Sequence, residues 1–265
     1  MHPQSIGVDV DDFRLPVREG LRRASDLRFR NAEIGAVTGE LAPPNLSSSG
    51  RRHVTRLVEG LGLQLAALTA DLPGLRLTDP RSADQRVAET LQILELARDL
   101  KTPTVTASVG TLTHPDTGEL SPLAVEALRR IGEYADSRGV IFAIRPSGDG
   151  AERTGQLLDA LGCPSIRICL DPAALVMAGV NPLPLIERLP DRIALVHARD
   201  GTAGLSERAG RETRLGEGEV DLVSILAGLS AADYHHPYIL RRTDSQTPSQ
   251  DLEEGRTVLA RYLPK

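Results

Sequence analysis

The sequence has no tryptophan, only two cysteines and 3% aromatic residues. So few aromatic rings argue against a stacking platform for nucleic-acid bases and against an aromatic cage for sugars. Two cysteines cannot build a disulfide scaffold, and Cys169 lies inside a run that is predicted to be a buried strand. We therefore expect Cys163 and Cys169 to be reduced thiols, as is usual in the cytoplasm.

Long apolar runs are missing as well. No segment approaches the roughly 20 apolar residues that are needed to cross a bilayer. Residues 1–5 lead directly into a predicted strand, without the charged segment and apolar run of a secretory signal. The sequence therefore predicts a cytoplasmic protein without a membrane partner.

The chain also lacks the positive charge of a nucleic-acid-binding protein. It has 36 Asp and Glu against 31 Lys and Arg, a net charge of −5, which argues against nucleic acid as the main partner. Glycine-rich nucleotide loops, an HExxH zinc motif and a GxSxG nucleophile elbow are absent. The glycine-rich residues 215–221 carry two glutamates that would repel a phosphate, so we predict a turn that leads to Asp221 as a helix cap.

What the sequence does contain is a regular alternation of strand-like and helix-like segments. The apolar, strand-like runs cover residues 6–10, 32–37, 63–68, 104–107, 140–144, 166–170, 193–196 and 238–240. Segments with helical periodicity separate them, most clearly after Asp79-Pro80 and after Ser121-Pro122, where proline occupies the first helical position. Eight such units without a linker predict a single (β/α)8 TIM barrel over residues 1–265. A doubly wound sheet would show a glycine-rich turn after the first strand.

Polar side chains stand at the carboxyl ends of several predicted strands. The residues in question are Arg145 after the fifth strand, Asp171 after the sixth, His197 and Asp200 after the seventh and Arg241 after the eighth. Glu33, on the second strand, is a further candidate. Because TIM barrels carry their chemistry at the carboxyl ends of the strands, these residues are the candidates for a functional site. His235 and His236 precede the eighth strand, at the opposite end, and are interpreted as surface residues.

Several of these segments resemble a known family. Residues 196–200 (VHARD), residues 215–221 (LGEGEVD) and the final strand resemble the C-terminal third of the sugar phosphate isomerase/epimerase family, which belongs to the xylose-isomerase-like TIM barrels. Residues 171–175 (DPAAL) resemble its strand-six motif, and residues 40–43 and 62–68 resemble its first half. The resemblance covers nearly the whole chain, and its most specific motifs lie in about 165–245.

The resemblance implies a divalent metal held by a glutamate, an aspartate, a histidine and a second glutamate on strands five to eight. This sequence keeps Asp171 and His197 but has Arg145 and Arg241 at the two glutamate positions. A guanidinium stays protonated and has no lone pair to give, and two of them would repel a divalent cation. We therefore predict that the usual metal site is lost, and no cofactor is predicted.

The residues leave alternatives open for each candidate. Arg145 and Arg241 either form a buried ion-pair network with Asp171, Glu33 and Asp200, or grip an anionic ligand such as a carboxylate or phosphate. Glu33 is then either a wall of the pocket or a partner of an arginine.

The remaining candidates carry alternatives of their own. His197 is either a general acid–base or a structural hydrogen-bonding residue. Asp200 either contacts the substrate or anchors a loop.

The leading hypothesis is a sugar (phosphate) isomerase/epimerase-like protein without the usual metal. His197 and Asp171 would be its catalytic residues, and the substrate, a sugar or an anionic sugar acid, would contact Arg145, Arg241, Glu33 and Asp200. The alternative is a non-catalytic barrel that binds a metabolite or a protein partner. Metal-dependent endonuclease activity fits least, because it needs more metal ligands and a basic surface. A homo-oligomer is compatible with the sequence.

Overall fold

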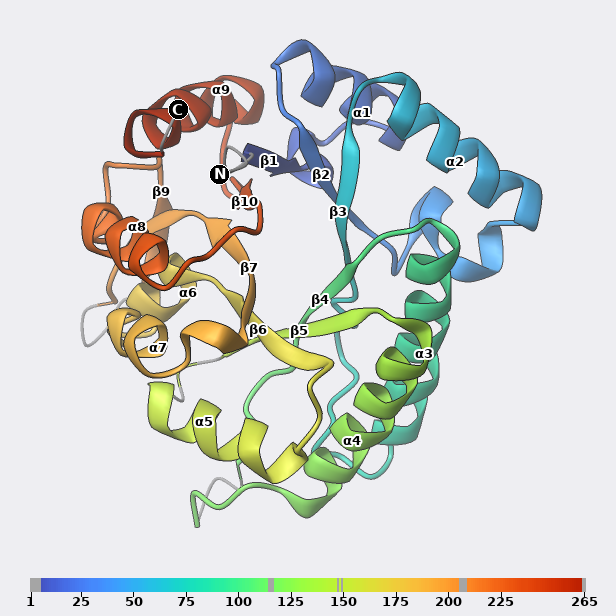
Figure 1. Ribbon diagram of the computed structural model, residues 1–265, viewed down its shortest axis with the longest axis vertical. Coiled ribbons are helices and arrows are strands. Elements are labelled where there is room, and N and C mark those ends of the chain that lie inside the picture. Colours follow the sequence, from blue (N-terminus) through green and yellow to red (C-terminus); the bar gives the residue numbers. More distant parts are fainter. Residues whose placement is uncertain (1–5, 114–116, 147, 149, 205–208, 264–265) are drawn as a thin grey trace.

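The barrel strands form the centre of the computed structural model, which describes residues 6–113, 117–146, 148, 150–204 and 209–263. The strands are β1 (Ile6–Asp9), β2 (Asn31–Gly35), β3 (Gln64–Thr69), β4 (Thr104–Ser108), β5 (Ile141–Arg145), β6 (Ile166–Leu170), β7 (Ile193–Ala198) and β10 (Tyr238–Leu240). They are all parallel and close in the order β1-β10-β7-β6-β5-β4-β3-β2. The predicted TIM barrel is thus confirmed (Figure 1).

Helices surround the strands, as Figure 1 shows. They are α1 (Val17–Asp26), α2 (Ser48–Gly60), α3 (Ala83–Asp99), α4 (Pro122–Arg138), α5 (Gly150–Leu161), α6 (Pro172–Met177), α7 (Leu183–Arg188), α8 (Leu222–Ala231) and α9 (Pro248–Tyr262). Short 3-10 helices add η1 (Val10–Phe13), η2 (Gly39–Leu41), η3 (Pro43–Asn45) and η4 (Pro190–Arg192). No helix of the described part is long and apolar enough to span a membrane.

Local signals in the sequence set several helix ends. The Ser121 side chain accepts a hydrogen bond from the Ala124 amide, and Pro122 begins α4 where no backbone donor is needed. Gly139 ends the same helix in the left-handed conformation at φ 64°, which glycine adopts without steric cost. Asp221 caps α8 in the same manner as Ser121 caps α4.

Two groups of side chains fill the interior. The larger lies between the strands and the helices, and the smaller comes only from strands and is dominated by alanines together with Cys169, Leu195 and Ile239. The small residues let the barrel close tightly. At Gly7 a β-carbon would lie 2.5 Å from the Ile239 side chain, so only glycine fits there.

Two features differ from the sequence-based expectation. No strand was predicted between residues 196 and 238, but β8 (Asp200–Thr202) and β9 (Arg211–Thr213) form an antiparallel pair in this segment. An additional short helix, α6, starts directly after β6 because the Asp171 side chain accepts a hydrogen bond from the Ala174 amide. Both features bring charged residues to the carboxyl end of the barrel.

Candidate functional site

Five of the six candidate side chains lie at the carboxyl end of the barrel and influence one another's charge. They are Glu33 in β2, Arg145 at the end of β5, Asp171 after β6, His197 in β7 and Arg241 after β10. Glu33 and His197 have no exposed surface, and the Arg241 side chain is only 14% exposed. Charges at this depth need partners close by, because burial removes their hydration.

His197 and Glu33 form an ion pair that is inaccessible to solvent. The His197 Nε2 atom lies 2.7 Å from Glu33 Oε2. Glu33 also accepts hydrogen bonds from the Thr69 and Thr106 hydroxyl groups. Burial opposes the charged form of Glu33, but the charge and hydrogen bond of His197 outweigh it and lower the pKa of Glu33 well below its usual range.

The same surroundings keep His197 protonated. Burial alone would lower the pKa of His197, but Cys169, Glu33 and Asp171 together raise it well above 6.5. The Asp171 carboxylate lies 3.8 Å from His197 Nδ1, too far for a hydrogen bond but close enough for strong electrostatic attraction. The ring has no exposed surface and its Nε2 atom is held by Glu33, so the geometry favours the structural role of His197 over the general acid–base role.

Asp171 takes a partner that the sequence analysis missed. Its Oδ2 atom lies 2.8 Å from Arg199 Nη1, and its Oδ1 atom caps α6. Burial opposes ionisation, but the Arg199 charge, His197 and the Ala174 amide together hold the pKa of Asp171 well below its usual range. Arg199 is itself fixed by Glu212 of β9, at 2.9 Å. Arg199 belongs to the VHARD segment, so its position directly after β7 was the available signal.

The two arginines at the strand ends also have partners of their own. Arg241 Nη2 lies 2.9 Å from Asp9 Oδ2, and Arg145 forms an ion pair with Asp71. Within the described residues neither arginine forms an ion pair with Asp171, Glu33 or Asp200. The predicted ion-pair network is therefore present, but its partners were predicted wrongly.

Asp9, Asp71 and Asp12 are the residues that sequence reasoning overlooked here. Asp9 ends β1, Asp71 follows β3, and Asp12 lies 3.7 Å from Arg241 Nε. All three carboxylates come from the first third of the chain, whereas the candidates were sought mainly after strands five to eight. The rule that polar residues follow strand ends would have found them if it had been applied to β1 and β3.

The residues at the four family ligand positions do not fit a divalent metal. Two of them are guanidinium groups, and Asp171 and His197 are already engaged by Arg199 and Glu33. The described part of the chain contains no group of three or more His, Cys, Asp or Glu side chains arranged to hold a metal ion. Each of the four positions instead faces an opposite charge.

Asp200 anchors the loop that precedes α8. Its carboxylate accepts hydrogen bonds from the backbone amides of Gly201, Gly216, Gly218 and Val220, at 2.8 to 3.1 Å. The residue is 1% exposed, and both of its carboxylate oxygens are occupied by these backbone amides. Of the two interpretations drawn from the sequence, the geometry favours the loop anchor over the substrate contact.

Replacing Asp200 by alanine is expected to lower the free energy of unfolding by about 2–4 kcal/mol, because buried amides lose their acceptor. Asp221→Ala is the matched control: it removes an exposed helix cap and should cost about 1 kcal/mol. Urea denaturation of both variants measures the difference. Equal losses in the two variants would contradict the anchoring role.

An open cavity of about 480 Å³ lies beside these ion pairs at the mouth of the barrel. Its polar lining residues include Asp9, Asp11, Glu40, Thr69, Asp71 and Arg241. Its apolar lining residues are Leu15, Pro16, Val17 and Val37. Glu33, Arg145, Asp171, His197 and Asp200 are not among its lining residues. Arg241 is therefore the one predicted substrate contact that reaches this cavity.

The cavity is acidic, because one guanidinium faces four carboxyl groups. Burial raises the pKa of Asp9 to about 8, against the lowering effect of Arg241 and with the help of Asp12 and Glu33. Burial likewise raises the pKa of Asp11, although the Gly35 amide donates to it. A carboxyl group that titrates near neutrality in a cavity is suited to proton transfer or to hydrogen-bond donation.

The closed barrel of eight parallel strands, with charged side chains gathered at their carboxyl ends, defines a (β/α)8 TIM barrel. The chain belongs to the xylose isomerase-like TIM barrel family, whose model matches residues 21–262. The resemblance to sugar isomerase and epimerase proteins noted in the sequence is thereby confirmed.

The curated and solved relatives agree with this membership. A probable endonuclease 4 from Oleidesulfovibrio alaskensis is 28% identical over 196 residues, which are 65% of this chain and 66% of that protein, just under two thirds of its length. A xylose isomerase domain protein from Planctomyces limnophilus superposes with a TM-score of 0.86 at 19% identity, over 98% of this chain and 97% of that one. D-Psicose 3-epimerase from Clostridium cellulolyticum H10, solved with D-tagatose, superposes with a TM-score of 0.76 at 14% identity, over 98% and 100%.

Proposed function

We propose that this protein is a sugar isomerase/epimerase-like barrel that has lost the divalent metal and binds a neutral polyhydroxylated compound in the mouth cavity. One observation carries the proposal: each of the four family ligand positions is already engaged by a partner within the chain. The pairs are Arg145–Asp71, Asp171–Arg199, His197–Glu33 and Arg241–Asp9. A metal would have to break several of these pairs to enter, and it would gain only two ligands.

The charge of the cavity supports a neutral ligand over an anionic one. A sugar acid or sugar phosphate would face Asp11, Glu40 and Asp71, whereas Arg241 is already paired with Asp9. Hydroxyl groups, in contrast, can donate hydrogen bonds to these carboxylates. The apolar lining residues, such as Val37, can pack against the C–H groups of a sugar. The structurally similar D-psicose 3-epimerase was solved with D-tagatose, which is a neutral ketose. The anionic ligand expected from the sequence is therefore the competing outcome of the test.

Asp9 is the group we propose for proton transfer in this cavity. Isomerases and epimerases must move a proton at a carbon beside a carbonyl, and a group with a pKa near the working pH does so best. With a pKa of about 8, Asp9 can hold a proton at pH 7 and release it without a large cost. His197 and Asp171, the catalytic residues expected from the sequence, would instead be structural.

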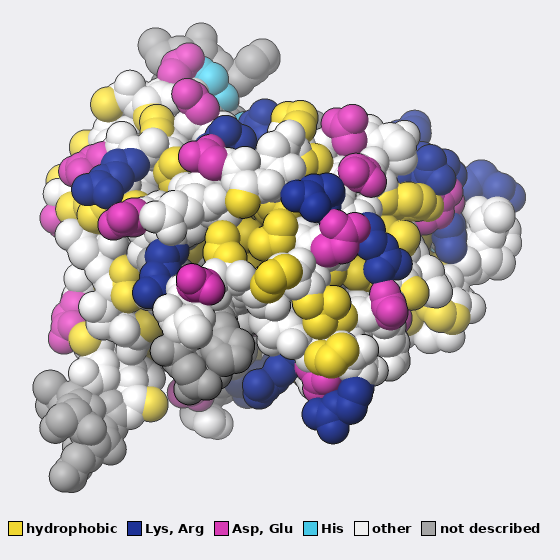
Figure 2. Space-filling model, turned by 90° about the horizontal axis from the view of Figure 1, so that it is seen from below, with side chains coloured by type: hydrophobic (Ala, Val, Ile, Leu, Met, Phe, Trp, Pro, Cys, Tyr) yellow, Lys and Arg dark blue, Asp and Glu magenta, His cyan; other side chains and the backbone are white. Residues whose placement is uncertain are grey.

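A non-catalytic binding barrel is the second candidate. Its support is the complete burial of His197 and the ion pair that holds Asp171, because these are the two family positions that the chain retains. Proton exchange distinguishes the candidates: a catalyst incorporates solvent deuterium into a bound ketose beside its carbonyl, and a mere binder does not. A nuclease is not proposed, and on the face in Figure 2 acidic side chains lie among the basic ones.

D-Tagatose and D-psicose are expected to raise the melting temperature of the protein after treatment with EDTA, whereas gluconate and sugar phosphates should have a smaller effect. Asp11→Asn should weaken the binding of the ketose about tenfold, because one charge-assisted hydrogen bond is lost. The same variant should strengthen the binding of an anion. Asp159→Asn, an exposed site on α5, is the control and should change neither.

The pH dependence of ligand affinity provides a second test. Asp9 is uncharged below a pH of about 8 and becomes negative above it, so any affinity for an anion must fall as the pH rises through that value. The affinity for a neutral ketose should change less. A ketose that binds only in the presence of a divalent ion would overturn the proposal, and so would gluconate that binds more tightly than either ketose.

A further inference from the structure

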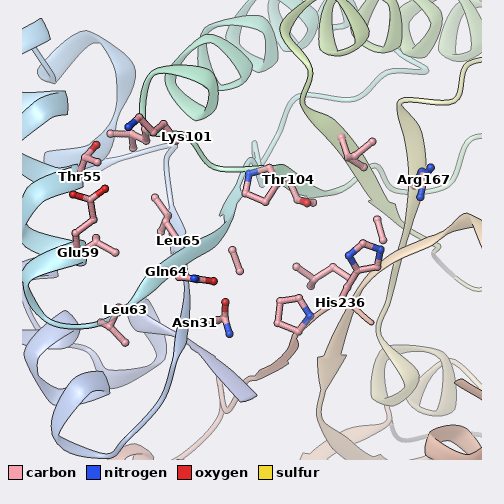
Figure 3. A pocket seen from close by; sticks show the side chains of 18 residues that line it. Asn31, Thr55, Glu59, Leu63, Gln64, Leu65, Lys101, Thr104, Arg167 and His236 are labelled. Carbon is pink, nitrogen blue, oxygen red and sulfur yellow. The ribbon is translucent and has the colours of Figure 1, made fainter. Parts of the chain in front are cut away.

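A second pocket lies at the other end of the barrel, where the strands begin. It has a volume of about 380 Å³ and is lined by the starts of β2 to β7, by α2 and by the segment after α3 (Figure 3). It shares no lining residue with the mouth cavity. The pocket is therefore independent of the proposed function, at the end of a TIM barrel that normally serves stability alone.

The floor of this pocket is largely apolar. Val58, Leu63, Leu65, Leu100 and Ile141 line it, and Leu65 and Ile141 remain half-buried rather than sealed. In Figure 3 the amide side chains of Asn31 and Gln64 lie near the centre of the view, between two sets of charged side chains. An apolar hollow with a few polar groups at its rim is the usual construction of a small-molecule site.

The rim carries two cations, Arg167 and Lys101, and neither forms an ion pair with a carboxylate of the described residues. Arg167 donates a hydrogen bond to the Pro164 carbonyl of its own turn. Most arginines of the carboxyl end, in contrast, are paired with Asp or Glu. The one acidic lining residue, Glu59, lies on the side of Lys101, whereas Arg167 and His236 lie on the opposite side (Figure 3).

His236 adds a neutral hydrogen-bonding group beside Arg167. Burial lowers the pKa of His236, and the charges of Arg167 and His235 lower it further. The Arg167 side of the pocket thus offers one fixed positive charge and one neutral imidazole, which together suit a carboxylate. His236 is exposed, as the sequence predicted, and it also lines this pocket.

We propose that the strand-start end of the barrel is a binding site for a small amphiphilic monocarboxylate. Its carboxylate would lie against Arg167 and His236, and its apolar body would cover Leu65, Leu100 and Ile141. Charge complementarity selects this class: a neutral hydrocarbon leaves Arg167 without a partner, and a cation is repelled by Arg167 and Lys101. A body of about ten carbon atoms suits a pocket of this size.

Titration of the full chain with decanoate, 1-decanol and decyltrimethylammonium, all below their micellar concentrations, tests the proposal by calorimetry. Decanoate is expected to bind one site per chain, about tenfold more tightly than 1-decanol, and the ammonium compound should not bind. Equal affinities for decanoate and decanol would overturn the charge-based selection. A decanoate affinity that changes in Asp11→Asn would place the ligand in the mouth cavity and would also overturn it.

Variants locate the site. Arg167→Gln should weaken decanoate binding about tenfold while leaving decanol unchanged. Leu65→Phe should weaken both ligands, because it fills the pocket. Arg30→Gln is the matched control, since Arg30 is exposed and precedes β2 at the same end without lining the pocket. If Arg167→Gln lowers the melting temperature of the protein, Lys101→Gln removes the other positive charge of the pocket and serves in its place. An Arg167→Gln variant that behaves like Arg30→Gln would overturn the proposal.

Discussion

Replacement of His197 by alanine is expected to lower the free energy of unfolding by about 3–5 kcal/mol, the cost of leaving a buried charge unpaired. The imidazolium lies 2.7 Å from Glu33 and 3.8 Å from Asp171, and all three side chains are buried. Without it, only the hydroxyl groups of Thr69 and Thr106 contact the Glu33 carboxylate. Urea denaturation at pH 7 measures the loss.

His235→Ala is the control for this experiment. His235 also contacts a carboxylate, Asp233, at 2.8 Å, but both side chains are exposed, so the loss should stay below about 1 kcal/mol. The double variant His197→Ala with Glu33→Gln should recover part of the stability, because the unpaired carboxylate is gone. Losses that simply add in the double variant would mean that the two side chains are not coupled.

The pH dependence of stability follows from the directions of the shifts. The pKa of Glu33 and that of Asp171 are lowered in the folded protein, so their contribution is complete above the ordinary values and is lost as the pH falls through the folded values. The pKa of His197 is raised, so its contribution is complete below 6.5 and is lost as the pH rises through its folded value. The Glu33–His197 ion pair therefore stabilises the protein most between the ordinary pKa of a glutamate and that of a histidine. His197→Ala should flatten the acid side of the stability profile.

The sequence predicted the barrel because its signals are local. Strand runs, the proline after Ser121 and the glycine at 139 act within a few residues of themselves, so they can be interpreted without knowing the rest of the fold. The strands β8 and β9 were not predicted, because strands of three residues with charged side chains show no alternation of apolar and polar positions. The helix after Asp171 has only six residues, which is too short for a helical periodicity to show in the sequence.

The positions of the site residues were predictable, but their partners were not. Arg145, Asp171, His197 and Arg241 could be placed at strand ends from the pattern of apolar runs. Arg241 meets Asp9 only because β10 pairs with β1 when the barrel closes, and that contact joins the two ends of the chain. Which carboxylate reaches which guanidinium depends on side-chain geometry, and so does the pocket around Arg167. Neither leaves a periodic trace in the sequence.

The double variant R145E/R241E is expected to create a divalent-metal site at the four family ligand positions. It adds two carboxylates to Asp171 and His197, which gives the set of oxygen and nitrogen ligands that zinc and manganese accept. It also removes the cations that now hold Asp71 and Asp9, so without metal the variant should unfold more easily than the wild type by about 3–5 kcal/mol. Metal should return part of that loss: about 2.7 kcal/mol at a free concentration one hundred times the dissociation constant.

Metal content after dialysis and melting temperature with and without EDTA are the measurements. The double variant should retain about one ion per chain, whereas EDTA should leave the melting temperature of the wild type unchanged. Arg145→Gln with Arg241→Gln is the matched control, because it releases Asp71 and Asp9 without supplying new ligands.

If this glutamine variant binds metal as well as R145E/R241E does, the freed aspartates of the mouth hold the ion. The family ligand positions would then not be where the metal was lost. Metal in the glutamate variant alone would mean that two guanidinium groups are sufficient to keep a divalent ion out of this barrel.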